Sequence, residues 1–465
     1  MHYLDRRIHA YLPSLQPSWV KTFNRSLYDY RDNVPYSSFK SLDEFNWYDG
    51  VNPRFRHSCA LYSPGHANLD LDQARKVDRL LFERNRASTF LLVDSGGYQV
   101  GKGLWPIDQL DSYVTRVLKW QEEIADLAVI LEVPTWTEID GQQIEFERAL
   151  ELTNGLLRAY AQQATGKIKF LNPLHGNTFE EGKRWFDATR WFNDEGHAVG
   201  WCFSSIFSLD LYEALRILAY MIEQEHFPRY LHFLGKGTAQ VPIIADLMRR
   251  TVPRCYPSHL RNIKGEAVLI VTADASSEFQ TVGRFVTIYR RSIPTHGAAL
   301  ATSPFTIKTE PFESQDRNRF PHDRAYPDVE GPILGRDANG VKFGDILAPV
   351  GSLSQYNLDA VSAAILIAHN LWVKLDAYEQ TSHLERGLRR IAYGMLEKET
   401  YEFADIMSRL MHESTNRGQF SDLGRDLVAC TVGLWRVFSE NVKTADERYD
   451  LLAEFETSAR ALFKS

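Results

Sequence analysis

Short apolar runs recur along the chain, and each ends in polar or glycine residues. Runs of this length, bounded by turn-forming residues, predict buried strands. The seven runs are CALYSPG from Cys59, FLLVDSGG from Phe90, LAVILEVPT from Leu127, KIKFLNPLHG from Lys167, AVGWCFSS from Ala198, YLHFLGKG from Tyr230 and AVLIVTADASS from Ala267.

Segments with helical spacing separate these runs, for example FEEGKRWFDATRWFNDE and LDLYEALRILAYMIEQE. Strand and helix alternate at intervals of roughly 30 to 40 residues, which predicts right-handed βαβ units and a parallel sheet. Seven or eight such units favour an α/β fold of the (β/α)8 TIM-barrel type, with insertions, over an open sheet.

The pattern changes after about residue 350, where amphipathic helical spacing replaces the strand signal. Three such segments begin LDAVSAAILIAHNLWV, HLERGLRRIAYGML and DLGRDLVACTVGLW. The stretch 306–345 is rich in Pro, Asp, Arg and Gly and indicates an irregular connection. We therefore predict a barrel with an N-terminal extension over residues 1–350 and a helical C-terminal domain over 351–465.

Polar residues close most of the predicted strands. In a barrel the carboxyl ends of all strands meet at one rim, which is where active sites lie. One such residue alone is well explained as a helix cap or a turn residue. Three carboxylates in this position favour a shared site. The residues expected to face it are Asp94, Glu132, His175, Trp201, Lys236 and Asp274.

Composition is that of an ordinary globular protein, with 44% hydrophobic and 24% charged residues over 465 positions. The N-terminus has no uninterrupted apolar core, and no apolar stretch is long enough to span a bilayer. The four cysteines are scattered and form no pair with metal-ligand spacing. We expect a reduced, cytoplasmic protein without membrane association.

The net charge of −7 argues weakly against a nucleic-acid partner, but positive charge gathers locally around the last strand. This cluster is either a solvated surface or a site for phosphates. It comprises Arg249, Arg250, Arg254, Arg261, Lys264, Arg284, Arg290 and Arg291.

The segment DSGGYQ, at residues 94–99, resembles the DSGG(F/Y)Q motif of the tRNA-guanine transglycosylases. Six further segments resemble motifs of this family in the same order, over residues 59–373. They are ADLAVILEVPT, PLHGNTFEE, HAVGWCFSS, RYLHFLGKGT, VTADASS and IAHNLWV. Glu132 stands where the family has aspartate, His175 where it has glutamine, and Trp201 where it has glycine.

The resemblance implies base exchange at a nucleoside C1′, with Asp274 as the covalent nucleophile and Asp94 as general acid and base. It also implies a slot for a guanine-like base, with Tyr98 on one face and Leu234 on the other, and Glu132 at the N–H edge. Trp201 either narrows the pocket for the 7-substituent or points into the core. The base-binding set is completed by His175, Gly200, Cys202 and Gly235.

The sequence departs from the family at its zinc site. Ile346, Ala348 and Gly351 stand where three cysteines would be, and His369 is left as the remaining ligand. None of the three can supply a thiolate, so we expect no bound zinc, no other cofactor, and a structural role for His369.

These departures resemble the DNA 7-deazaguanine transglycosylases of dpd DNA-modification clusters. That branch implies DNA as the polymer, 7-cyano-7-deazaguanine (preQ0) as the incoming base, and possible helper proteins. The basic cluster would then hold phosphates around an extruded nucleotide. A divergent tRNA-guanine transglycosylase and a non-catalytic nucleic-acid-binding subunit remain as alternatives, and preQ1 is not separated from preQ0.

Overall fold

The computed structural model describes the barrel and parts of the C-terminal region. The described residues are 10–24, 42–48, 52, 54–66, 69–139, 141–237, 241–261, 267–283, 287–291, 307–311, 363–376, 422–439, 442 and 444–463. Five residues named in the predictions above lie outside this set: Lys264, Arg284, Ile346, Ala348 and Gly351.

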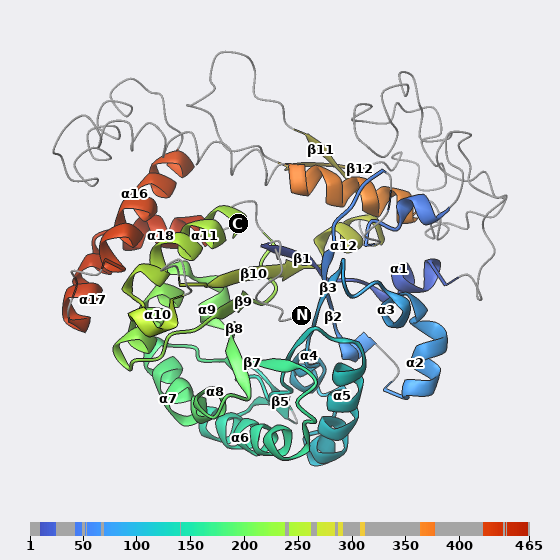
Figure 1. Ribbon diagram of the computed structural model, residues 1–465, viewed down its shortest axis with the longest axis horizontal. Helices are drawn as coiled ribbons and strands as arrows, with labels where there is room; N and C mark the ends of the chain where they lie inside the picture. The colour runs from blue at the N-terminus through green and yellow to red at the C-terminus, as the bar shows by residue number, and fades with distance from the viewer. Residues whose placement is uncertain are drawn as a thin grey trace.

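Eight parallel strands form the central sheet, in the order β1-β10-β9-β8-β7-β4-β3-β2 (Figure 1). The two edge strands approach each other through a parallel bridge between Ser14 and Leu61, with a 2.8 Å bond from Leu15 N to Leu61 O. The sheet is therefore a nearly closed barrel with surrounding helices, and the (β/α)8 prediction is confirmed. The strands are β1 (Tyr11–Pro13), β2 (Cys59–Tyr62), β3 (Phe90–Val93), β4 (Leu127–Val129), β7 (Lys169–Leu174), β8 (Ala198–Phe203), β9 (Tyr230–Phe233) and β10 (Ile270–Ala275).

The eighth strand comes from the segment interpreted as an N-terminal extension. β1 pairs in parallel with β10, and Leu12 lies opposite Asp274. Three residues are too few to give a periodic signal, so the pattern of the sequence alone did not reveal this strand. Its consequence is that the N-terminal segment supports the strand that carries the predicted nucleophile.

Amphipathic helices and shorter helical turns surround the barrel. Two of the longer helices have side-chain caps: Asp210 accepts from the amides of Tyr212 and Glu213, and Thr178 accepts from that of Glu181. The helices are α1 (Pro17–Thr22), α2 (Leu71–Val77), α3 (Arg79–Glu83), α4 (Gly97–Gly101), α5 (Leu110–Ile124), α6 (Phe146–Gln163), α7 (Phe179–Thr189), α8 (Trp191–Asp194), α9 (Ile206–Leu209), α10 (Leu211–Glu223), α11 (Val241–Thr251) and α12 (Ser277–Gly283). Two antiparallel hairpins, β5 (Glu138–Ile139) with β6 (Gln142–Gln143) and β11 (Thr287–Arg291) with β12 (Ile307–Pro311), stand apart from the barrel sheet.

The barrel interior is an apolar cluster to which every strand contributes. Because side chains alternate along a strand, residues two apart point to the same side. The cluster therefore identifies the inward positions. They are Leu12, Cys59, Leu61, Phe90, Leu92, Leu127, Val129, Leu171, Cys202, Tyr230 and Ile270.

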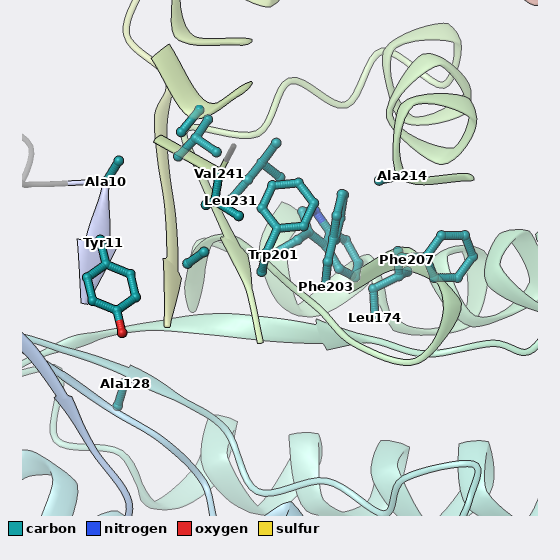
Figure 2. Close-up of a cluster of buried hydrophobic side chains, with 14 of the residues drawn as sticks. Ala10, Tyr11, Ala128, Leu174, Trp201, Phe203, Phe207, Ala214, Leu231 and Val241 are labelled. Atoms are coloured by element: carbon teal, nitrogen blue, oxygen red, sulfur yellow. The ribbon is translucent and has the colours of Figure 1, made fainter. Parts of the chain in front are cut away.

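The outward positions join a second, larger cluster between the sheet and the helices. Figure 2 shows part of it, where Trp201 and Phe203 of β8 lie beside Leu231 of β9 and Val241 of α11. This division into inner and outer side chains decides which predicted site residues can meet.

The C-terminal helices α16 (Asp422–Val437), α17 (Ala445–Ala453) and α18 (Glu456–Phe463) confirm the helical character predicted for this region. They pack on the barrel's outer layer: Arg460 pairs with Asp210 and, at 2.9 Å, with Glu213, and the ring centroids of Tyr449 and Phe179 lie 6.0 Å apart. The proposed boundary near residue 350 lies outside the described residues and stays a prediction.

A helix at residues 363–376 is fastened to the barrel by a buried ion pair. Lys374 Nζ lies 2.5 Å from Glu278 Oε1 and donates to the Tyr11 hydroxyl and to Ser277 Oγ, each at 2.8 Å. Because Tyr11 belongs to β1 and Glu278 follows β10, this cluster joins three distant parts of the chain just beyond Asp274. Removing one partner of such a pair would leave an uncompensated buried charge.

In the part of the chain that the structure describes, no helix is long and apolar enough to cross a bilayer. The thiols of the four cysteines are free, and three of them are buried.

Candidate active site

Asp274 lies on the inner side of β10, at the carboxyl end, and is 7% exposed. Its Oδ1 accepts from the backbone amide of Gly235 at 2.8 Å and lies 3.2 Å from His232 Nε2. Both partners belong to β9 or the turn that follows it, so pairing of β9 with β10 fixes the carboxylate.

Asp94 directly follows β3 and is two residues beyond the inward-facing Leu92, so it faces the same interior. Burial raises the pKa of Asp94, and the negative charge of Asp274 raises it further, whereas a hydrogen bond from the Ser63 side chain lowers it. The two predicted catalytic carboxylates therefore lie close enough to influence each other, and their environments differ.

The two glycines of DSGGYQ serve the close packing at this rim. Gly96 has a φ of 90°, in the left-handed region, and a side chain there would also strike the Trp105 ring. A Cβ on Gly97 would lie 2.0 Å from Glu132 Oε1. The motif thus lets the backbone after Asp94 approach a second carboxyl group.

Glu132 is 3% exposed, and its Oε2 accepts a 2.5 Å hydrogen bond from Ser95 Oγ. Burial, with a smaller contribution from the charge of Asp94, raises the pKa of Glu132 to about 8. His175 Nε2 lies 3.9 Å from Glu132 Oε1, and this buried nitrogen has no hydrogen-bond partner among the described residues. Burial lowers the pKa of His175 to about 3, so its ring is neutral.

Helices α5 and α6 hold the backbone on which Asp94 and Glu132 stand. Gln121 of α5 donates to the carbonyl oxygens of Asp94, at 3.2 Å, and Val129, at 2.6 Å. Tyr160 of α6 donates to Gln121 and accepts from the amide of Leu131. On the other side, His175 Nδ1 lies 3.2 Å from Ser205 Oγ. Ser205 has a φ of 52°, a conformation that costs a non-glycine residue energy and that clusters at functional sites.

The raised pKa of Glu132 predicts a pH-dependent stability. The unfolded chain releases this proton near pH 4.5, whereas the folded protein keeps it up to about pH 8. The stability that the protonated Glu132 contributes is therefore fully present below pH 4.5 and is lost as the pH rises towards 8. Relative to the wild type, Glu132→Gln should gain stability across this range by up to about 1.4 kcal/mol per pH unit.

Urea unfolding of both proteins between pH 5 and pH 9 measures this difference. Glu138→Gln, at an exposed glutamate of hairpin β5–β6, is the matched control and should follow the wild type. Parallel pH profiles for the wild type and Glu132→Gln would contradict a buried, protonated Glu132.

The three consecutive residues predicted on β8, Gly200, Trp201 and Cys202, lie on two different sides of the sheet. Cys202 faces the interior, where burial and the charges of Asp94, Glu132 and Asp274 raise the pKa of its thiol. Trp201 faces outward: its indole donates to His226 Nε2 at 2.8 Å, and it lies among outer-layer side chains in Figure 2. Of the two possibilities for Trp201, the structure places it in the core. Gly200 is required by packing, since a Cβ there would lie 1.9 Å from the Tyr230 carbonyl.

Tyr98 lies on α4 and is 58% exposed. Its ring centroid lies 5.9 Å from that of Trp136, and Lys102 Nζ lies 5.6 Å from the Trp136 ring. Leu234 is partly buried against the interior cluster, and Gly235, with a φ of 68°, has open space where a side chain would be. Tyr98, Leu234 and Gly235 therefore border the interior at the rim.

Lys236 is buried in the turn after β9. Burial lowers the pKa of Lys236, and the charge of Asp210 partly offsets that effect. The charge of Lys236 is therefore influenced by Asp210, which caps α10.

The described arginines of the basic cluster nearest to α11 are engaged within the fold. Arg249 is largely buried and donates to the Val271 carbonyl at 2.6 Å, and Arg250 pairs with Asp246. Arg254 lies 3.6 Å from the centroid of the Trp435 ring. Because α11 runs antiparallel to the strands, its last turn lies at the amino end of β10, opposite the rim. The guanidinium of Arg249 is therefore engaged inside the fold, and phosphate binding by the basic cluster stays a prediction.

Arg261 is likewise engaged within the fold. It donates to the carbonyl oxygens of Arg254 and Tyr256. Arg290 and Arg291 belong to β11, and their side chains lie outside the described ones.

Three contributors were not anticipated from the sequence: His232, Ser95 and Trp136. His232 lies two residues after the inward-facing Tyr230, so strand alternation could have placed it in the interior. Ser95 is visible in DSGGYQ, but its bond to Glu132 depends on tertiary structure. No sequence signal joins Trp136 to Tyr98.

Among the described residues no three histidine, cysteine or acidic side chains are grouped as a metal site would require. His369 is buried, and its ring centroid lies 6.3 Å from that of Trp372. The absence of zinc stays a prediction, since residues 346–351 are not described.

Comparison with known proteins gives no assignment. No protein-family model matches the chain, and no curated protein shows significant sequence similarity to it. The functional argument therefore depends on the residues themselves and on the geometry of the rim.

Proposed function

We propose that this protein is a glycosyltransferase that exchanges a guanine-type base at C1′ of a polynucleotide through a covalent aspartyl–sugar intermediate. The observation that carries the proposal is the unequal environment of two neighbouring interior carboxyl groups. Asp274 has one oxygen held by two nitrogens, whereas burial raises the pKa of Asp94. Such a difference lets one group act as nucleophile and the other as proton donor.

In the first half of the reaction an oxygen of Asp274 bonds to C1′ as the C1′–N bond breaks. The departing guanine takes the bonding electron pair and a proton from Asp94. In the second half the incoming base gives its proton to Asp94 and attacks C1′, and the carboxylate of Asp274 is released. The exchange needs no redox change and no nucleoside triphosphate.

The base-recognising groups are proposed from the polar side chains beside this pair. Tyr98 is exposed and free to stack on a base. Glu132 and the unpartnered Nε2 of His175 are hydrogen-bonding groups for the edge of a purine. Binding of a guanine N–H edge favours the ionised form of Glu132, which makes that step easier as the pH approaches 8.

The polymer we propose is DNA, with preQ0 as the incoming base. Support comes from the sequence, in which the three zinc-binding cysteines of the tRNA enzymes are replaced. A target base must leave the duplex to reach an interior carboxylate. Because Arg249 is engaged inside the fold, its charge does not support DNA in particular. Lys102, which lies beside Trp136 and Tyr98, places a positive charge near the rim.

Labelled guanine, incubated with the protein and with duplex DNA, single-stranded DNA or unmodified tRNA, tests the proposal. We expect label in DNA, competition by unlabelled preQ0, and polymer binding that weakens as salt is raised, because phosphate contacts release counterions. Label in tRNA alone would establish the tRNA enzyme. No label in any polymer, with binding retained, would favour the non-catalytic subunit.

A further inference from the structure

His232 forms a buried polar link between β9 and β10. It is fully buried and lies two residues after the inward-facing Tyr230. Its Nε2 lies 3.2 Å from Asp274 Oδ1, and its Nδ1 lies 2.8 Å from Thr272 Oγ1. Thr272 Oγ1 donates in turn to the Tyr230 hydroxyl at 3.1 Å. Both ring nitrogens therefore have a partner, which fixes the orientation of the imidazole.

The nitrogen that faces Asp274 carries a proton when the carboxyl group is ionised. A carboxylate can only accept hydrogen bonds, so Nε2 must be the donor to it, whatever the role of Nδ1 towards Thr272. The second donor to the same oxygen is the amide of Gly235 at 2.8 Å. A φ of 68° at Gly235 directs this amide, and such a conformation favours glycine.

The two oxygens of Asp274 therefore differ. Oδ1 receives both donors, whereas Oδ2 has no hydrogen-bond partner among the described residues. A carboxylate held through one oxygen has a fixed rotamer and presents the other oxygen. Fixed donors aimed at developing charge are a large source of catalytic power.

We propose that His232 is the positioning residue of the nucleophile, holding Oδ1 of Asp274 so that Oδ2 is the oxygen that bonds to C1′. This inference depends on the proposed base exchange. In the first half the Oδ2–C1′ bond forms as the bond to guanine breaks. In the second half the incoming base attacks C1′, and the Oδ2–C1′ electron pair returns to the carboxylate. His232 and the Gly235 amide stabilise the negative charge that then develops on Oδ1.

Replacement of His232 tests this role kinetically. His232→Phe should lower kcat by about 10²–10³-fold, the loss typical of one fixed donor, with little change in KM for the free base. His232→Gln retains an amide donor and should recover most of that loss. His226→Phe removes a partly buried histidine from the outer layer and should leave kcat near that of the wild type.

A folded His232→Phe variant with kcat close to the wild-type value would overturn the proposal, as would a Gln variant no better than Phe. If His232→Phe does not fold, the comparison of His232→Gln with Thr272→Val decides. Loss of the Thr272 hydroxyl should lower kcat by freeing the imidazole to turn, and an unchanged kcat would contradict the orientation described here.

An NMR measurement of the His232 side chain separates this inference from the proposed function, because it needs no substrate. The groups that face the ring are Asp274 and Thr272 of β10 and the Tyr230 hydroxyl of β9. Asp274→Asn should shift the imidazole resonances of His232, since the charge-assisted hydrogen bond from Nε2 becomes a neutral one. An unchanged chemical shift would refute the coupling, whether or not the wild type exchanges bases. If the wild type exchanges no base but the shift is seen, the proposed function fails and the contact stands.

Discussion

Asp274→Asn should lower base exchange by roughly 10⁴-fold or more, because loss of a covalent nucleophile removes the intermediate on which both half-reactions depend. The substitution is nearly isosteric. An asparagine can keep its Oδ1 as an acceptor for His232 and the Gly235 amide, so the packing between β9 and β10 should be retained. Exchange of labelled guanine into the polymer measures the loss, and thermal unfolding checks the fold.

Asp187→Asn is the matched control for the change of charge. Asp187 accepts from Tyr220 on the exposed surface of the outer helices, and its replacement should leave exchange unchanged. A second readout follows from the covalent step: a denaturation-resistant protein–polymer adduct should form with the wild type and be absent with Asp274→Asn. If the variant kept a tenth of the normal turnover, Asp274 would not be the nucleophile.

Most of the barrel could be predicted because seven of its strands are buried apolar runs bounded by polar residues. β1 could not be predicted because a three-residue strand shows no periodic pattern. Its place in the barrel depends on pairing with β10 and β2. The order of strands in the closed sheet is likewise a property of long-range pairing. The helical C-terminal part was clear from its spacing, whereas its contacts with α10 were not.

The carboxyl groups of the site were predictable because each follows a strand, and strand ends share one rim. Alternation along β8 could have refined the assignment, since Gly200, Trp201 and Cys202 are consecutive and cannot all face the interior. The structure assigns Cys202 to the interior and Trp201 to the outer layer. The partners that tune the site, such as Ser95 for Glu132, lie on different strands and have no local signal.

Charge along the sequence was a poor guide to charge in space. Arg249 is near Asp274 in the chain, yet a helix that runs back along the barrel carries it to the other end of the strand. Burial at that end requires hydrogen-bond partners for the guanidinium, and the Val271 carbonyl provides one. Charge reversal at Arg249 would therefore report on folding rather than on binding of a polymer.

Asp94→Asn should separate the two half-reactions. Burial and the charge of Asp274 raise the pKa of Asp94, which favours the protonated form that can give its proton to departing guanine. Without it, steady-state exchange should fall by about 10²–10⁴-fold, the usual contribution of general acid–base catalysis.

The covalent intermediate provides the sharper measurement for Asp94. An incoming base cannot be deprotonated by asparagine, so the fraction of enzyme trapped as adduct should rise even though the adduct forms slowly.

The pH profile of Asp94→Asn should also change. In the wild type the first half-reaction should slow as the pH rises above the pKa of Asp94, because the acid is then ionised, and Asp94→Asn should lose this dependence. A matched pair of single-turnover measurements, with Asp187→Asn as the control, resolves both effects. Normal steady-state exchange by Asp94→Asn, with an unchanged pH profile, would remove Asp94 from the mechanism and leave Glu132 as the acid to be tested next.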